Sequence, residues 1–135
     1  MKDKELIKIA LTARNHARAP YSQFLVGAAL LCGNGNIYSG CNIESSSFGL
    51  SLCAERVALA KALSEGETDF RCMAVVAEGQ RPVKPCGACL QLLRDYAPDL
   101  ELILGNLEGQ YEQISLTRLL PYPFDSGDLP NNCTK

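Results

Sequence analysis

The sequence has no long apolar run, it has only one histidine, and its net charge is small. Crossing a bilayer takes roughly 18 consecutive apolar residues, and no stretch of the 135 residues approaches this length. The net charge is −2, and the basic residues are scattered, without the stripe that is typical of nucleic-acid-binding proteins. We therefore expect no membrane partner and no nucleic-acid partner.

Repeats, low-complexity tracts and linkers are also absent. The hydrophobic fraction of 47% and the charged fraction of 21% are ordinary for a globular protein, and the length suits one domain that spans residues 1–135. The segment from Met1 to Glu5 is charged and leads into an amphipathic pattern, which is not the pattern of a signal peptide. We expect a cytoplasmic protein.

Hydrophobic periodicity and turn residues predict elements in the order α-β-β-α-β-α-β-β-α. Helices are expected over residues 6–17, 53–64, 87–96 and 116–120, and strands over residues 24–31, 36–40, 73–77, 100–104 and 111–114. Asn34-Gly35 is a hairpin signal between the first two strands, and Pro20 is expected to end the first helix. The fold class is therefore α/β: a three-layer α-β-α sandwich whose mixed five-stranded sheet combines an antiparallel hairpin with βαβ crossovers.

Seven cysteines are many for a small cytoplasmic chain. A reducing compartment disfavours disulfides, so metal binding or catalysis is the better explanation. Cys53, Cys86 and Cys89 stand in motifs. The other four are Cys32, Cys41, Cys72 and Cys133. The first three of these are expected to be small buried hydrophobes, and Cys133 lies in a polar tail where no role is expected.

The two motifs are Cys53-Ala54-Glu55-Arg56 and Pro85-Cys86-Gly87-Ala88-Cys89. Each coincides with the predicted start of a helix, where free N–H groups and the helix dipole favour thiolate over thiol. Three protein ligands leave the fourth position of a tetrahedral zinc ion for water, which distinguishes a catalytic site from a structural one. We therefore predict one Zn²⁺ per subunit, held by Cys53, Cys86 and Cys89.

Glu55 and Arg56 follow the first ligand. A carboxylate in the first turn of that helix can exchange protons with a water molecule at the metal, as base and then as acid, so Glu55 is the predicted catalytic residue. Three thiolates leave the cluster anionic, and we expect Arg56 to offset this charge by hydrogen bonding to the ligand sulfurs.

Simpler explanations exist for each residue alone. A C-x-x-C pair is often structural or redox-active, a glutamate in a first helical turn often only complements the dipole, and a lone cysteine is often buried filler. The joint pattern favours the catalytic interpretation, because no fourth Cys or His stands at the spacing of a closed structural site. His16 is expected inside the first helix and unconnected with the metal.

The C-x-E and P-C-x-x-C pattern is a signature of zinc deaminases, and the chain resembles, over nearly its whole length, the small homotetrameric cytidine deaminases of the cytidine/deoxycytidylate deaminase superfamily. The resemblance includes both motifs, and at the second motif it continues as far as Gln91. Three further stretches also carry the resemblance. They are Tyr21-Ser22-Gln23-Phe24-Leu25-Val26-Gly27-Ala28-Ala29, Gly40-Cys41-Asn42-Ile43-Glu44, and Leu119-Leu120-Pro121 followed by Phe124.

The resemblance implies roles for further residues. Phe24 would stack on the pyrimidine ring, Asn42 and Glu44 would hydrogen-bond the ribose, chiefly its 3′-hydroxyl, and the backbone N–H of Ala54 would help to hold the reacting oxygen. Phe124 would reach the site of a neighbouring subunit, which makes a tetramer part of the active site. From the residues alone, Phe24 could equally belong to the core, Asn42 could form a turn and Glu44 could be a solvated charge.

The chain departs from the family pattern in two places. Leu90 stands where the family usually has an arginine after the last cysteine, so either Arg56 balances the charge alone or the contact is rebuilt. The segment Ser45–Leu52 also differs, and Phe48 stands where many members have a tyrosine with its hydroxyl.

The expected function is zinc-dependent hydrolytic deamination of cytidine and deoxycytidine to uridine and deoxyuridine in pyrimidine salvage. Water attacks C4, Glu55 moves protons to N3 and to the amine, and ammonia leaves. Three alternatives stay open: a deaminase of another small aminopyrimidine nucleoside such as an antibiotic, an enzyme that edits DNA or RNA, and a non-catalytic structural zinc module.

Overall fold

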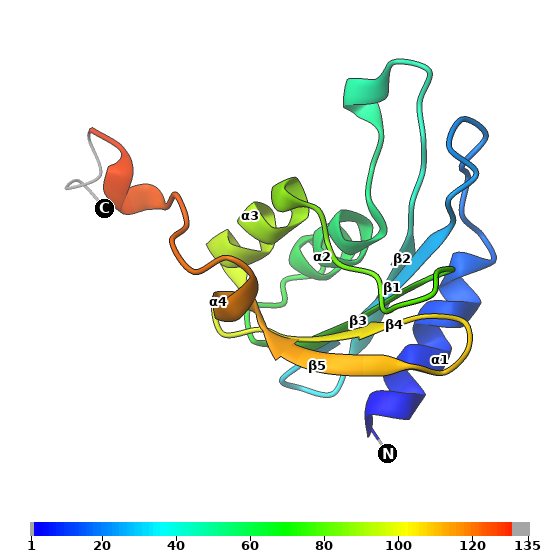
Figure 1. Cartoon of the computed structure of the whole chain (residues 1–135). Helices are drawn as coiled ribbons and strands as arrows, with labels where there is room; N and C mark the ends of the chain where they lie inside the picture. Colours follow the sequence, from blue (N-terminus) through cyan, green and yellow to red (C-terminus); the bar gives the residue numbers. More distant parts are fainter. Residues whose placement is uncertain (1, 131–135) are drawn as a thin grey trace.

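The computed structural model describes residues 2–130, and the predicted elements are all present in the predicted order (Figure 1). The helices are α1 (Lys2–Arg14), α2 (Ala54–Ser64), α3 (Gly87–Tyr96) and α4 (Leu116–Leu119), with short 3₁₀ turns at Phe48–Leu50 and Ser126–Asp128. The strands are β1 (Val26–Cys32), β2 (Ile37–Cys41), β3 (Phe70–Ala77), β4 (Glu101–Gly105) and β5 (Tyr111–Ser115).

The strands form one mixed sheet in the order β2-β1-β3-β4-β5. β1 pairs antiparallel with both β2 and β3, β3 pairs parallel with β4, and β4 pairs antiparallel with β5. The connections through α2 and through α3 therefore each join parallel strands, as the predicted βαβ crossovers require. The expected hairpin turn is present, and Gly35 in it has a φ of +93°, which glycine adopts without steric cost.

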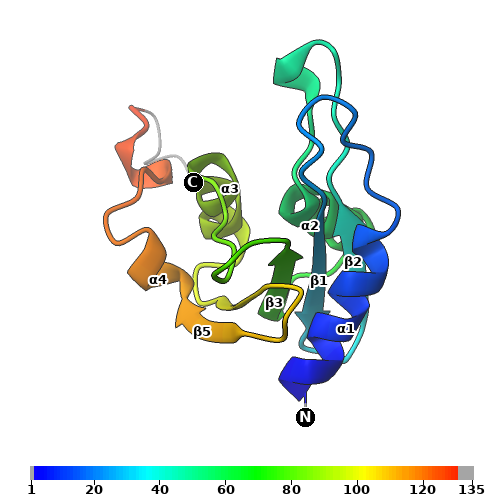
Figure 2. The same ribbon diagram turned by 45° about the vertical axis from the view of Figure 1, so that its right-hand side comes forward.

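Helices cover both faces of the sheet, so the three-layer prediction is confirmed. Figure 2 shows α1 and α3 on opposite sides of the sheet. On one face, Leu6 and Ala10 of α1 pack against Ala74 and Val76. On the other face, α2 and α3 build the larger core, which includes Leu59, Leu93, Leu30, Met73, Val75 and Leu104. The middle strands are buried on both sides, which explains their continuous apolar runs.

Close packing on a glycine fixes the helix that carries the first cysteine motif. A Cβ atom at Gly40 of β2 would lie 2.7 Å from the carbonyl oxygen of Ala54 and 2.7 Å from the amide nitrogen of Ala58. Only glycine allows α2 to lie this near the sheet. The first turn of α2 is thereby held against the end of β2.

The first helix begins and ends earlier in the chain than predicted. It ends at Arg14, so His16 lies in a turn after the helix, and the prediction that Pro20 ends it is wrong. After Arg14 the backbone hydrogen bonds run to the third preceding residue and no longer to the fourth; the His16 amide, for example, donates to the Ala13 carbonyl. The side chain of Arg14 donates to the carbonyl of Leu25. None of the helices in the described part of the chain combines the length and the hydropathy that a membrane span requires.

Candidate metal centre and the adjoining pocket

Two helix starts bring three sulfur atoms together. Cys53 is the N-cap residue of α2, Cys86 is the N-cap residue of α3, and Cys89 lies in the first turn of α3. The Sγ atom of Cys86 lies 3.8 Å from that of Cys53 and 3.5 Å from that of Cys89, and all three lie within 4.8 Å of one another. Zn–S bonds of about 2.3 Å at tetrahedral angles place sulfurs about 3.8 Å apart. The donor set and its spacing therefore fit zinc.

The cluster is also electrostatically prepared for a cation. A hydrogen bond from the Cys89 thiol, supported by Cys86 and by the charge of Arg56, lowers the pKa of Cys53 to about 6. The same contact, together with burial, raises the pKa of Cys89. Without metal the sulfurs thus share protons that a divalent cation would displace. Within residues 2–130, no other group of three or more His, Cys, Asp or Glu side chains gathers its ligand atoms in this way.

Glu55 lies beside the sulfurs as a buried acid. Only 5% of this residue is exposed, and burial raises the pKa of its carboxyl to about 7, with a further contribution from the negative charge of Cys53. Glu55 is not one of the clustered ligands, yet it lines the same pocket as Cys53 and Cys86. A carboxyl group in this environment can both accept and release a proton near neutral pH.

Arg56 follows Glu55 and is the predicted source of positive charge. Its Nη2 donates to the carbonyl of Ser51, while its buried Nε is the one side-chain nitrogen or oxygen in the described chain that is buried without a hydrogen-bond partner. A buried donor without a partner is uncommon and costly. Arg56 is thus placed to stabilise thiolates, and its hydrogen bonds to ligand sulfurs stay a prediction.

A pocket of about 220 Å³ opens above the cluster. Seven of the predicted site residues line this pocket: Phe24, Asn42, Glu44, Cys53, Ala54, Glu55 and Cys86. Cys89 lies below them, fully buried. Ala54 opens α2, where backbone N–H groups have no partner within the helix. Convergent polar groups in one partly apolar pocket are typical of a small-molecule site.

Polar contacts join the segments that carry Phe24, Asn42 and Glu44, which line the pocket together with the cysteines. The buried side chain of Asn42 donates from Nδ2 to the carbonyl of Phe24 at 2.8 Å and accepts at Oδ1 from the amide of Val26 at 2.9 Å. One N–H of the Asn42 amide remains for a ligand. Phe24 is 44% exposed at the pocket, so it does not belong to the core. Glu44 accepts hydrogen bonds from Tyr21 and Ser22.

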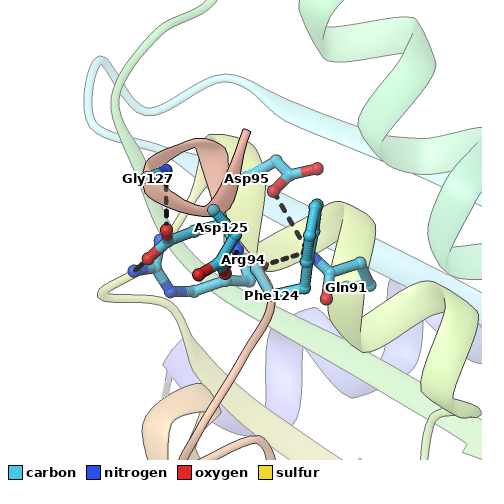
Figure 3. Close-up of polar contacts among 7 residues, drawn as sticks. Gln91, Arg94, Asp95, Phe124, Asp125 and Gly127 are labelled. Atoms are coloured by element: carbon cyan, nitrogen blue, oxygen red, sulfur yellow. Dashed lines mark hydrogen bonds and ion pairs between the residues drawn. The ribbon is translucent and has the colours of Figure 1, made fainter. Parts of the chain in front are cut away.

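Phe124 does not line the pocket of its own chain. It is 57% exposed and lies on a C-terminal segment that packs beside α3 (Figure 3). Gln91 Nε2 donates to the carbonyl of Phe124 at 2.7 Å, and Arg94 lies 3.5 Å from the carboxylate of Asp125. Any contact of Phe124 with such a pocket must involve a second chain, and this role stays a prediction.

The two departures from the family pattern lie in different surroundings. Leu90 is 8% exposed and packs in the core under α3, where an arginine would be desolvated. Phe48 is exposed and contacts Tyr21 edge to face, with ring centroids 6.1 Å apart.

The remaining cysteines mostly follow expectation. Cys32 and Cys72 are buried as predicted. Cys41 is only half-buried, which corrects its prediction, because it ends the edge strand β2. Cys133 lies outside the described residues.

Sequence analysis missed several residues that line the pocket. They are Ser22, Val26, Ser51, Leu52, Val83 and Lys84. Val83 and Lys84 precede the second motif, and Ser22 stands two positions before Phe24, so proximity to the motifs was the one available signal. Chain proximity alone does not show which side chains turn toward a pocket.

The fold and the site define a zinc-binding protein of mixed α/β architecture with an acid group beside the metal site. The family model "Cytidine and deoxycytidylate deaminase zinc-binding region" matches residues 1–102. A cytidine deaminase of Halalkalibacterium halodurans is 50% identical over 92% of this chain and 95% of its own. The crystal structure of cytidine deaminase from Burkholderia pseudomallei superposes with a TM-score of 0.89 at 45% identity, covering 92% of this chain and 100% of that one.

A more distant relative carries a different printed name. Blasticidin-S deaminase of Bacillus cereus is 31% identical over 90% of this chain and 91% of its own. The chain thus belongs to the cytidine and deoxycytidylate deaminase family, and zinc is the metal that its three-cysteine cluster holds.

Proposed function

We propose that the chain catalyses the hydrolytic deamination of cytidine and deoxycytidine to uridine and deoxyuridine, with release of ammonia. One observation carries this proposal: a buried carboxyl, Glu55, lies beside three convergent sulfurs in a pocket that Phe24 also lines. The similarity to cytidine deaminases over most of the chain supports it.

Zinc held by Cys53, Cys86 and Cys89 would supply the Lewis acidity that makes water a nucleophile near neutral pH. Glu55 takes a proton from the attacking water and passes it to N3 of the base as the C4–O bond forms. It then takes the second proton from the oxygen and delivers it to the amine as the C4–N bond breaks. Ammonia leaves, C4 becomes a carbonyl, and Glu55 regains its starting state.

The other pocket residues hold the nucleoside. Phe24 stacks on the pyrimidine ring, the free N–H of Asn42 and the carboxylate of Glu44 bind the ribose, and the Ala54 amide holds the reacting oxygen. Phe124 completes the pocket of a neighbouring subunit in a homotetramer. The exposure of Tyr122, Phe124 and Leu129 along one segment supports such contacts.

We place this reaction in pyrimidine salvage in the cytoplasm, carried out by residues 1–135 as one domain. The thiol ligands support this location, because a reducing compartment keeps them available for metal. Free nucleosides, and neither nucleic acids nor membranes, are the proposed partners. The even spread of charge supports this choice, since a polyanion would require a basic surface.

The test is direct. Zinc-loaded protein is incubated separately with cytidine, deoxycytidine, blasticidin S and cytosine-containing single-stranded DNA and RNA oligonucleotides. Deamination of the small substrates is followed by the change in ultraviolet absorbance, and that of the oligonucleotides by mass spectrometry. We expect turnover of the first two and little of the antibiotic. A preference for the antibiotic would support the alternative substrate, and deamination of cytidine only within single-stranded DNA or RNA would support an editing enzyme. No turnover at all, with full zinc occupancy, would overturn the proposal in favour of a structural module.

A further inference from the structure

The hydroxyl group of Ser22 connects the two residues proposed to hold the base and the sugar. It donates to Oε2 of Glu44, and its oxygen accepts from the backbone amide of Phe24 at 3.0 Å. The backbone amides of Tyr21 and Ser22 both donate to Oε1 of Glu44, each at 3.0 Å. One side chain therefore joins the loop that carries Phe24 to the loop that carries Glu44.

The backbone between Ser22 and Phe24 has an unusual conformation. Gln23 has a φ of +61°, and it is the one non-glycine residue with positive φ in the described chain. Such a residue needs surrounding contacts to hold it in place. The Gln23 amide donates to the carbonyl of Ala19 at 2.8 Å, and Asn42 holds the carbonyl of Phe24. The Ser22 hydroxyl adds the contact to the amide of Phe24.

Hydrogen-bond accounting shows what this arrangement leaves for a ligand. Each carboxylate oxygen can accept about two hydrogen bonds. Oε1 of Glu44 already has two donors, whereas among residues 2–130 Oε2 has only the Ser22 hydroxyl. The second acceptor site of Oε2 therefore remains for a donor such as a ribose hydroxyl, and Ser22 fixes the direction in which it points. The same contacts lower the pKa of Glu44, so it is ionised near neutral pH.

We propose that Ser22 is a positioning residue, which fixes Glu44 and Phe24 relative to each other and thereby sets the affinity for nucleosides that carry a 3′-hydroxyl. The inference rests on the proposed function, because it takes the nucleoside as the ligand. Ser22 takes no part in the chemistry at C4 and acts through its two neighbours.

The test compares Ser22→Ala with Ser22→Thr, which keeps a hydroxyl, and with Ser64→Ala. Ser64 is a matched control because its hydroxyl donates to the carbonyl of Lys61 near the end of α2, and Ser64 does not line the pocket. Losing a charge-assisted hydrogen bond should raise KM for cytidine about tenfold in Ser22→Ala. We expect kcat to stay within about twofold, since the lost contact acts equally in the ground and transition states. Ser22→Thr should recover most of the affinity.

Discrimination at the sugar separates positioning from a structural role. Wild type should favour cytidine over 3′-deoxycytidine, and Ser22→Ala should lose most of that preference. Calorimetric titration with uridine and 3′-deoxyuridine measures the same difference without turnover. Circular dichroism checks that each variant is folded.

Each further result has a defined meaning. If Ser22→Ala matches Ser64→Ala in KM and in sugar preference, the positioning role is overturned while the proposed function stands. An equal loss for both sugars in a destabilised variant also overturns it, in favour of a structural role. If wild-type protein neither binds uridine nor deaminates cytidine, the proposed function fails and takes this inference with it.

Discussion

Glu55 and Glu44 line the same pocket, and their surroundings shift their pKa values in opposite directions. Glu55 is 5% exposed, and burial raises its pKa to about 7. Glu44 is solvent-accessible, and hydrogen bonds led by the Ser22 hydroxyl lower its pKa. The metal side of the pocket therefore keeps an acid that can exchange a proton, while the sugar side keeps a fixed anion.

The two sides also differ in how they are built. The metal side, which consists of the three cysteines and Glu55, is formed by the N-termini of α2 and α3, and α2 is held against β2 at Gly40. The sugar side depends on contacts between loops that are far apart in the sequence, such as Ser22 with Glu44 and Phe24 with Asn42. We infer that changes on the metal side act on the chemical step, and that changes on the sugar side act on binding.

Removing zinc should have the largest effect. Dialysis against a chelator is expected to abolish turnover, because without the Lewis acidity of the metal the proton transfer to Glu55 alone cannot make water a sufficient nucleophile. The fold should persist, since its apolar core lies between the sheet and the helices. Far-ultraviolet circular dichroism with and without chelator, followed by zinc readdition, measures both properties. Unfolding on chelation would instead indicate a structural zinc module.

Glu55→Gln should have the second largest effect on turnover. Loss of a positioned general acid–base lowers rates by about 10² to 10⁴, and we expect kcat to fall by at least this much. Zinc content should not change, because Glu55 is not part of the sulfur cluster. Glu65→Gln, at the exposed end of α2, is the control. Substantial turnover in zinc-loaded Glu55→Gln would remove Glu55 from its proposed role.

Arg56→Gln should act on metal binding. The positive charge of Arg56 helps to lower the pKa of Cys53, and loss of a residue that supports metal ligands costs about 10- to 100-fold in metal affinity. We expect weaker zinc binding of this order in competition with a chromogenic chelator. Unchanged zinc affinity and turnover would leave the buried Nε of Arg56 without a function in the site.

These differences explain how much could be predicted from sequence. The metal side was predictable because Cys53, Glu55, Cys86 and Cys89 stand in two motifs at predicted helix starts, and the two motifs together match the zinc deaminase signature. The order of the helices and strands along the chain followed from turn residues and apolar runs, whereas the order of the strands in the sheet was not predicted. The roles of Phe24, Asn42 and Glu44 came only from family resemblance, since their contacts join loops distant in the chain.

Tertiary contacts also explain the prediction errors. The apolar spacing of the first helix continues to Ala17, but the helix ends at Arg14, whose side chain binds the carbonyl of Leu25. The first strand begins at Val26, two residues late, because Gln23 has a positive φ and Asn42 occupies the carbonyl of Phe24. Neither contact leaves a periodic signal in the sequence.

Phe24→Ala tests the sugar side with a smaller effect. Base stacking on an aromatic side chain contributes about 1–3 kcal/mol, so KM for cytidine should rise about tenfold or more, with a smaller change in kcat. Tyr111→Ala is the control, because this exposed aromatic lies on β5 and does not line the pocket. A fall in kcat at unchanged KM would contradict the division between a binding side and a chemical side.

Glu67→Gln should have the smallest effect, and only on stability. The Glu67 carboxylate resembles that of Glu44 but lies away from the pocket, where Asn36 Nδ2 at 2.9 Å, the Tyr38 hydroxyl at 2.8 Å and Asn34 Nδ2 at 3.0 Å donate to it. These bonds lower its pKa below the ordinary value of 4.5. Because the folded-state pKa of Glu67 is below its ordinary value, the ionised carboxylate stabilises the folded protein at pH values above 4.5. This contribution to stability is lost as the pH falls through the folded-state pKa.

Wild type should therefore have a higher thermal midpoint than Glu67→Gln at neutral pH, and the two midpoints should converge on acidification. Scanning calorimetry between about pH 3 and pH 7 covers the titration range of a carboxylate. Turnover of cytidine should be the same for both proteins. A difference that grows in acid would mean that the hydrogen bonds favour the protonated form. Changed turnover would mean that a hydrogen-bonded carboxylate outside the pocket also contributes to catalysis. Catalysis would then depend on a region beyond the metal side and the sugar side of the pocket.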